Sequence, residues 1–541
     1  MEESKTQTQS SVAASQASPV EPVPSVVSVQ ELPQSGNSSK KAGIFLIILA
    51  LIVAGCGGYY LFTHKVAEKA AVVVKKDIPV VNLSSGEKGY NAFYPGIDNS
   101  NNFIGLNRQI FEGLVVYQDS SRLVPLLATS WTNPDNSTWI FNLKHNVMFH
   151  TGRVMTADDV KASIDAAANS DLGSQFNTTI KSVTVLAPDK IQIKTDGPDP
   201  ILLNRLSFLW IFDTKSDKKN DAINGTGPYV VKAGTTPTNE EADLVAFDNY
   251  HGGHVNTRAV NFVFSTDTDL PKKFNDGRLN YINFAYTDHS AEVTVPHNSL
   301  ASQELSVFHI IVNSQRADSP LANKMVRQAL IIGTDPLALA KVRGVPSAAP
   351  AGQIIPPTVP GYLASVKRPD TDVAKAKAML AAAGYPKGFD ATLTYFAKSK
   401  ATAEEISHQF AAMGITVKLD PQDIIKNLAE KVLGGKTDLS FNTISTDLFD
   451  GSDVFAQYLD GKNYKNTQAS ALLDQSNKTL DSAARLKLLQ QINQLTIDDP
   501  LDIPVYIPDA THTFTSPNFV IKRDTPGTGD LGVYFWKAYQ K

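Results

Sequence analysis

The sequence predicts an α/β fold for the larger, C-terminal part of the chain. Strand-like and helix-like segments alternate through residues 305–445, the pattern of a sheet covered by helices. Ser319 and Asp335 are capping residues that each precede a proline suited to the first position of a helix. Gly384 follows an alanine-rich segment and marks a helix end. With 541 residues, 42% of them hydrophobic, the chain is long enough to form more than one core.

Composition argues against several functional classes. The net charge of −4 disfavours a general nucleic-acid binder, which needs a basic surface to displace counterions from phosphate. The single cysteine, Cys56, permits neither an internal disulfide nor a multi-cysteine zinc or iron–sulfur site. We therefore expect no nucleic-acid partner and no cofactor.

The N-terminal residues predict a tail and a membrane anchor. Residues 1–41 are rich in Ser, Gln, Val and Pro with few large apolar side chains, and this composition predicts disorder. Residues 42–62 carry no charge over a length that can cross a bilayer as one helix, and aromatic residues stand at its far end. Residues 63–77 form a spacer before the globular part. Lysines flank both sides of the span, so its charges do not fix its orientation.

Cys56 leaves a second interpretation of this segment open. The sequence VAGC at 53–56 resembles the cleavage box of bacterial lipoproteins, in which the thiol is acylated and becomes the new N-terminus. The long preceding tail and the apolar residues that continue past Cys56 favour an uncleaved transmembrane anchor. The mass of the mature chain distinguishes the two.

The segment 138–160 holds histidines and adjacent aspartates that invite a catalytic interpretation. Trp139, Phe141 and Leu143 lie at every second position, between Ile140, Asn142 and Lys144, and predict a strand with one apolar face, after which His145 begins a turn. Thr156 followed three residues later by Asp159 predicts a capping box at the start of a helix. Asp158 also falls in the first turn, where the helix dipole favours a negative charge. A structural role for both aspartates is the expectation, not an acid–base pair.

Six segments of the chain carry a resemblance to a known family: QIFEGLVVYQDSSRLVPLLATSW (109–131), FHTGRVMTADDV (149–160), NGTGPYVV (224–231), FDNYHGGHVNTRAVNFVF (247–264), MVRQALIIGTDPLALAKVRG (325–344) and DTDVAKAKAMLAAAGYPKGF (370–389). In this order they resemble the extracellular solute-binding proteins of family 5, the peptide- and nickel-binding receptors of ABC importers. The similarity spans about residues 90 to 390, and the C-terminal segment is compatible but looser.

The resemblance implies an α/β, two-lobed periplasmic-binding-protein fold of the class with an inserted third subdomain. The first lobe would take residues 78–305 and 496–541, including the inserted subdomain, and the second lobe residues 306–495. The strand 306–314 would enter the second lobe and 502–508 would return from it. Ligand would bind between the lobes and be enclosed as they close.

The resemblance also implies the function: a membrane-anchored, extracytoplasmic substrate-binding protein of an ABC importer, with the bulk of the chain outside. It would deliver oligopeptides or dipeptides to permease subunits served by a separate ATPase, and would not be an enzyme itself. A nickel chelate, an oligosaccharide or another small solute is the alternative ligand, and a ligand-sensing receptor the alternative role. A tethered hydrolase is disfavoured because no nucleophile or zinc signature is present.

Candidate ligand-binding residues follow from the same resemblance. Peptide-binding members carry an Asp in a "G-W-x-x-D" segment, and Asp447 falls at that acidic position, with Ile444 at the position of the Trp. Asp447 would pair with the ligand ammonium, and Ser445 is a second candidate ligand-binding residue. A simple turn cap near Asp450 is the other role open to Asp447. Phe93 and Tyr94 are expected to line the cleft.

Two further patterns are weak. His251 and His254 could share a metal only if both rings faced one side, and no third ligand is evident; a Gly-rich turn is the expectation. GGKT at 434–437 lacks the upstream glycine of a phosphate-binding loop, since Glu430 stands there. We therefore predict no metal and no nucleotide site.

Overall fold

The computed structural model describes most of the globular part of the chain. The described residues are 81–84, 101–118, 122–168, 179–216, 224–233, 241–265, 269–283, 292–300, 306–345, 347–446, 448–459, 463–508, 513–521 and 535–540. The predicted tail (1–41), anchor (42–62) with Cys56, and spacer (63–77) lie outside them, as do Phe93, Tyr94 and Asp447. Among the described helices, none combines the length and apolarity needed to span a bilayer.

A four-stranded antiparallel sheet lies early in the chain. Its spatial order is β4 (Ala128–Asp135), β5 (Thr138–Leu143), β7 (Lys190–Thr195) and β6 (Ile180–Ala187). The predicted strand at 139–143 is confirmed as β5, whose Trp139, Phe141 and Leu143 are buried. The helix α3 (Ala157–Ala168) begins where the capping residues predict, and it packs on β6. Two short strands, β2 (Val115–Tyr117) and β3 (Leu123–Pro125), precede the sheet as a separate pair.

A seven-stranded mixed sheet joins distant parts of the chain. Its order is β12 (Asn298–Leu300), β19 (Thr513–Thr515), β11 (Tyr281–Asn283), β1 (Val81–Ser84), β10 (Ala259–Val263), β9 (Glu241–Ala246) and β8 (Tyr229–Val231). Since β19 pairs with both β11 and β12, a strand from near the C-terminus belongs to the same sheet as β1, the first described strand of the chain. The helix α2 (Asn101–Ile110) packs near β8 and contributes Leu106 and Ile110 to the core of this region.

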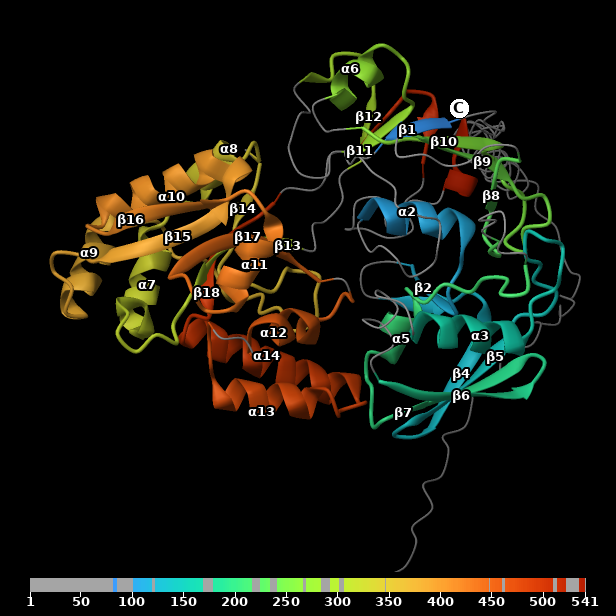
Figure 1. The fold of residues 1–541 in the computed structure, drawn as a ribbon, viewed down its shortest axis with the longest axis horizontal. Helices are drawn as coiled ribbons and strands as arrows, with labels where there is room; N and C mark the ends of the chain where they lie inside the picture. The colour runs from blue at the N-terminus through green and yellow to red at the C-terminus, as the bar shows by residue number, and fades with distance from the viewer. Residues whose placement is uncertain are drawn as a thin grey trace, which may run out of the picture. The chain divides into compact units, whose positions relative to one another are not determined.

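A six-stranded sheet holds the second large core (Figure 1). Its order is β14 (Ala349–Pro350), β18 (Asp502–Ile507), β13 (Ser306–Val312), β17 (Leu439–Ser445), β15 (Asp390–Phe396) and β16 (Thr416–Gln422). The two strands expected to connect the lobes, β13 and β18, are present and pair antiparallel as neighbours in this sheet. The lobe boundary drawn at residue 496 stays a prediction, although the hydrogen bonds of β18 join 502–507 to the six-stranded sheet.

Helices cover this sheet because their apolar faces need burial. The helices that share its core cluster are α7 (Lys324–Gly333), α8 (Pro336–Val342), α9 (Val373–Ala382) and α10 (Lys400–Ala412). The predicted starts are confirmed: the Asp335 carboxylate accepts hydrogen bonds from the backbone of Leu337 and Ala338, and Ser319 caps a short turn before α7. Gly384, at φ +98°, ends α9 as predicted, in a conformation that favours glycine.

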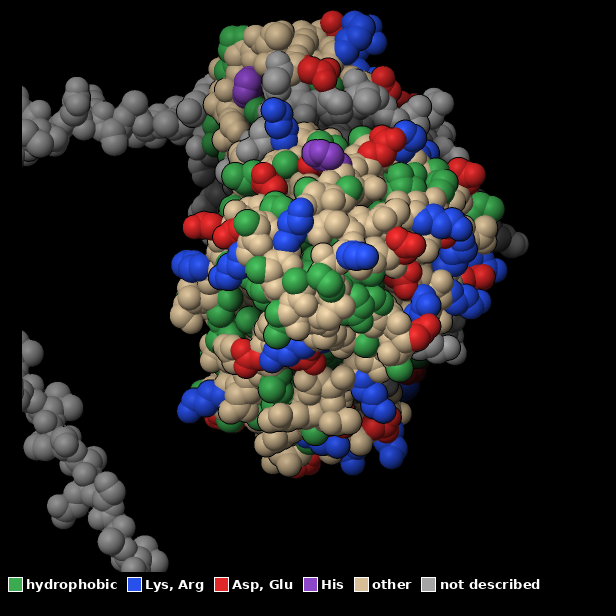
Figure 2. Space-filling model, turned by 90° about the vertical axis from the view of Figure 1, so that its left-hand side faces the viewer, with side chains coloured by type: hydrophobic (Ala, Val, Ile, Leu, Met, Phe, Trp, Pro, Cys, Tyr) green, Lys and Arg blue, Asp and Glu red, His purple; other side chains and the backbone are tan. Residues whose placement is uncertain are grey.

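We call the part of the chain that forms the four-stranded and seven-stranded sheets the first region, and the part around the six-stranded sheet, residues 306–508, the second region. The remaining helices lie around these two regions. They are α5 (Leu202–Leu206), α6 (Leu270–Asn275), α11 (Ile425–Leu433), α12 (Gly451–Leu459), α13 (Thr467–Ser476) and α14 (Ser482–Asp498), and a last strand pair is β20 (Phe519–Val520) with β21 (Tyr539–Gln540). On the side of the molecule where α9 and β16 lie in Figure 1, acidic and basic side chains are interspersed, and no single-sign stripe dominates (Figure 2). This mixture agrees with the small net charge.

Candidate ligand-binding site

The loop after β17 contacts residues from the first half of the chain. We call residues 446–450 the 446–450 loop. The Tyr117 hydroxyl, at the end of β2, donates a hydrogen bond of 3.0 Å to the Leu448 carbonyl. The Asn204 amide, from α5, donates to the same carbonyl at 2.7 Å. The ring centroids of Tyr117 and Phe449 lie 4.2 Å apart, and Phe208 stacks with Phe449 at 6.4 Å. The loop is thus a point where two remote parts of the chain meet.

The backbone of this loop is held in an unusual conformation. Phe449 has φ +54°, which is sparsely populated for a residue with a side chain and costs on the order of 1–3 kcal/mol. The Asp450 N–H donates to the Thr446 hydroxyl at 3.0 Å, closing the loop on itself. Burial of the Phe449 ring against Tyr117 offsets this cost, so packing between the two regions sets the loop's shape.

A buried ion pair fixes the C-terminal end of the loop. The Arg485 guanidinium, from α14, donates to both oxygens of Asp450 at 2.6 and 2.7 Å. The same carboxylate accepts the Ser452 N–H at 2.8 Å and so caps α12. Both side chains are less than a tenth exposed. The Asp450 carboxylate is therefore neutralised internally and fully hydrogen-bonded.

Burial also shapes the titration of Tyr117. Desolvation, reinforced by the negative charge of Asp450, raises the pKa of Tyr117 well above its ordinary value. The phenol therefore stays protonated at neutral pH and remains the donor to the Leu448 carbonyl. The buried Arg108 guanidinium of α2 lies 5.6 Å from the centre of the Phe208 ring, so a cation contacts this aromatic cluster.

Of the ligand-binding residues predicted from the sequence, the structure describes one, Ser445. Ser445 is the last residue of β17; it pairs with Ser306 of β13 and its side chain is exposed. Asp447 lies outside the described residues, between the buried Thr446 and Leu448, so its predicted role stays a prediction. Phe93 and Tyr94 stay predictions for the same reason. Sequence reasoning missed Tyr117, Asn204 and Arg485, for which no local pattern gave a signal.

The family-like motifs of the first half converge on one buried carboxylate, that of Glu112. It accepts hydrogen bonds from the Thr226 hydroxyl at 2.8 Å and the Tyr250 hydroxyl at 2.9 Å, and the His251 Nε2 lies 2.6 Å away. Lys144 Nζ approaches the other ring nitrogen of His251 at 3.0 Å. Three of the similar segments, 109–131, 224–231 and 247–264, thus share a structural cluster. The resemblance rests in part on residues that hold the fold together.

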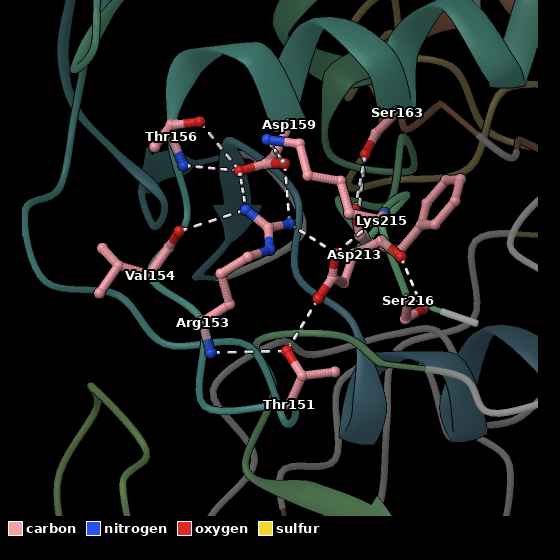
Figure 3. Close-up of polar contacts among 10 residues, drawn as sticks. Thr151, Arg153, Val154, Thr156, Asp159, Ser163, Asp213, Lys215 and Ser216 are labelled. Atoms are coloured by element: carbon pink, nitrogen blue, oxygen red, sulfur yellow. Dashed lines mark hydrogen bonds and ion pairs between the residues drawn. The ribbon is translucent and has the colours of Figure 1, made fainter.

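Asp159 has the structural role predicted for it (Figure 3), and Asp158 lies beside it in the first turn of α3. Asp159 accepts the Thr156 N–H at 2.9 Å, the contact expected of a capping box. Its two oxygens also receive the Arg153 guanidinium at 2.8 and 2.9 Å, and Arg153 reaches Asp213 at 2.5 Å. Burial by itself would raise the pKa of Asp159 and of Asp213, but hydrogen bonds, those from Arg153 first, outweigh it and lower both.

The structure also shows where the histidines and the GGKT segment noted in the sequence lie and what they contact. His150 contacts the backbone of Gly225 and Gly227, and the exposed His145 lies 3.4 Å from Asp189. His251 is buried at Glu112, whereas the adjoining turn leaves His254 exposed, and no metal-ligating group of three or more acidic, histidine or cysteine side chains occurs among the described residues. GGKT follows the C-terminal end of α11, where carbonyls rather than N–H groups are exposed, so it does not match a phosphate-binding loop.

Comparison with known proteins places this geometry in a family. The family model for bacterial extracellular solute-binding proteins, family 5 Middle, matches residues 122–466. Heme-binding protein A of Haemophilus influenzae is 26% identical over 387 residues, covering 65% of this chain and 70% of the relative. The glutathione-binding protein GsiB of Salmonella paratyphi A is 24% identical over 406 residues, covering 70% and 78%.

The solved structures support the same fold. The periplasmic binding protein DppA from Helicobacter pylori, in complex with the peptide STSA, aligns with a TM-score of 0.70 at 22% identity, covering 86% of this chain and 98% of that one. The likeness confirms the mixed α/β, two-lobed periplasmic-binding-protein fold expected from the sequence. Because the family model covers well over half of the chain, the chain belongs to the bacterial extracellular solute-binding proteins of family 5.

Proposed function

We propose that this chain is the membrane-anchored, extracytoplasmic substrate-binding protein of an ABC importer and that it binds short peptides between its two lobes. Family 5 binding proteins work with ABC permeases and bind peptides or other small solutes. The proposal takes residues 42–62 as the anchor, with acylated Cys56 as the alternative attachment.

The observation that carries the proposal is the position of the 446–450 loop. It follows a central strand of the six-stranded sheet and contacts Tyr117 and Asn204 of the other region through the Leu448 carbonyl. A ligand bound beside this loop would be within reach of side chains from both regions. Ligand contacts made to both lobes exist only in the closed arrangement, so binding shifts the population toward closure.

Asp447 is the residue we assign to the ligand ammonium. The other carboxylate of the loop, Asp450, is already held by Arg485 and by the start of α12. A carboxylate that is partly shielded from water pairs strongly with an ammonium group when other hydrogen bonds satisfy the remaining lone pairs of its oxygens. In the proposal Ser445 supplies a hydroxyl at the exposed end of β17, and Phe93 and Tyr94 line the cleft.

The ligand is identified most directly from the protein itself. The full-length chain is purified from membranes without added solute, denatured, and the released small molecules are analysed by mass spectrometry. The proposal predicts a heterogeneous set of short peptides with free amino termini. Recovery of one non-peptide solute instead, such as a heme or a metal chelate, would contradict the peptide assignment and support the alternative small-solute binder. A relative named for heme binding makes that alternative concrete.

A further inference from the structure

A pocket lies inside the second region, apart from the 446–450 loop. It has a volume of about 360 Å³, within the range of small-molecule sites, roughly 300–1,000 Å³. Its walls come from α7, α9, the segment 352–369 and the link from α14 into β18. Ile331, Ile354, Met379 and Leu501 give it a mainly apolar lining. A ligand with an apolar body fits such a lining.

The polar groups of the wall are already bonded within the protein. Gln353 exchanges hydrogen bonds with the Leu363 backbone at 2.8 and 2.9 Å, and the Thr496 hydroxyl donates to the Asn493 carbonyl. The Asp502 carboxylate, the acidic group of the lining, accepts the Val312 N–H at 3.0 Å and lies 2.9 Å from His309 Nδ1. A ligand that needs many hydrogen bonds, such as a sugar or a peptide backbone, would find few partners here.

Two lysines of the lining, in contrast to the polar groups described above, have ammonium groups available to a ligand. Lys367 and Lys375 are exposed members of the wall, and neither ammonium makes a hydrogen bond or ion pair with another residue that the structure describes. Each can therefore turn toward an anion at the pocket. Because these two groups are positively charged, they favour a ligand whose polar end is an anion. The rest of the ligand should be apolar, to match the lining.

We propose that this pocket binds a medium-chain monocarboxylate, with its hydrocarbon chain against Ile331, Ile354 and Met379 and its carboxylate at Lys367 and Lys375. The site is independent of the peptide site between the lobes and of the chemistry proposed there. Its occupant would also touch Pro504 of β18, the strand that pairs with β13.

The methionines offer a direct test. The chain contains six, of which Met379 lines the pocket, whereas Met148 and Met155 are not among the lining residues. The full-length chain, labelled with ¹³C in the methionine methyl groups and held in lipid nanodiscs, is titrated with octanoate and observed by NMR. The Met379 signal is assigned by its loss in Met379→Leu. Octanol and octylammonium, which share the chain length but not the charge, are titrated in parallel.

The expected result is a saturable shift of Met379 with octanoate, no shift of Met148 or Met155, and weaker responses to the neutral and cationic analogues. Lys367→Gln combined with Lys375→Gln should raise the octanoate Kd about threefold to tenfold, as loss of two exposed ion pairs would. Lys377→Gln, on the same helix but outside the pocket lining, should leave it unchanged. An unmoved Met379, equal responses to all three compounds, or shifts that spread to Met148 and Met155 would each overturn the proposal.

Discussion

Arg485 and Asp450 form a bidentate ion pair, with nitrogen–oxygen distances of 2.6 and 2.7 Å, that joins α14 to the loop before α12. Both side chains are buried, and the Arg485 Nε donates in addition to the Ser476 carbonyl. The pair keeps the second acidic residue of the loop away from any ligand. It also makes the loop's position depend on a helix that follows it in the chain.

Breaking this pair from one side should be costly. Arg485→Met leaves a buried carboxylate without its counterion, and we expect a loss of about 3–5 kcal/mol in the free energy of unfolding by urea. The double variant Arg485→Met with Asp450→Asn removes the buried charge as well and should recover part of that loss. If the single and double variants were equally stable, the ion pair would not be the source of the effect.

The shared acceptor at Leu448 predicts non-additive behaviour. Tyr117→Phe or Asn204→Ala alone should cost roughly 0.5–1.5 kcal/mol, because the Leu448 carbonyl keeps the other donor. The double variant leaves a buried carbonyl with neither side-chain donor and should cost about 0.5 kcal/mol or more beyond the sum. Urea unfolding of the four proteins in the cycle measures the coupling. Strict additivity would show that the two hydrogen bonds act independently.

The Arg153 cluster predicts a dependence on acid. The pKa of Asp159 and of Asp213 is lowered in the folded chain, so their stabilising effect is present above the ordinary carboxyl value of about 4 and is lost as pH falls through the folded values. Arg153→Met removes the hydrogen bonds that lower them. We expect about 1.5–3 kcal/mol less stability at neutral pH and an acid-unfolding midpoint at higher pH.

Circular dichroism from about pH 7 down to about pH 2 locates that midpoint. Arg258→Met is the matched control, because its partner Asp248 is 79% exposed and such a pair contributes little. Superimposable acid titrations for the wild-type chain and Arg153→Met would contradict the account of this cluster.

Gly225 should not tolerate a side chain. A Cβ at this position would lie 2.0 Å from the Ile110 carbonyl oxygen, a backbone atom at the end of α2 that cannot move freely. Gly225→Ala should therefore lower the thermal stability by about 1–3 kcal/mol or more. Gly197→Ala is the control, since no heavy atom lies within 4 Å of its Cβ position. Equal unfolding temperatures would exclude tight packing as the reason for glycine here.

Sequence predicted best the features that depend on neighbouring residues. The capping contact of Thr156 with Asp159, the Asp335 cap before Pro336 and the turn at Gly384 each need information from within about four positions, and all three are confirmed. Alternation likewise placed β5 and its buried face.

What the sequence could not show are contacts between remote residues. The Tyr117 hydroxyl and the Leu448 carbonyl are 331 positions apart, and Glu112 and Thr226 are 114 apart. No periodicity or motif names such partners, because they depend on how whole elements pack. Ile444, which stands where peptide-binding members carry Trp, is buried in β17 within the shared core. Its side chain is therefore part of the hydrophobic core, at a position where the resemblance suggested a residue of the ligand site.

The central claim is that Asp447 binds the ammonium group of a peptide held between the lobes. Isothermal titration calorimetry of the full-length chain with a tetrapeptide mixture, free and N-acetylated, tests it most directly. We expect binding of the free peptides, with a loss of about tenfold or more, or roughly 1.4 kcal/mol, on acetylation and in Asp447→Ala. The exposed Asp474→Ala on α13 should bind as the wild-type chain does. Unchanged isotherms for Asp447→Ala, or equal binding of acetylated peptides, would contradict the claim.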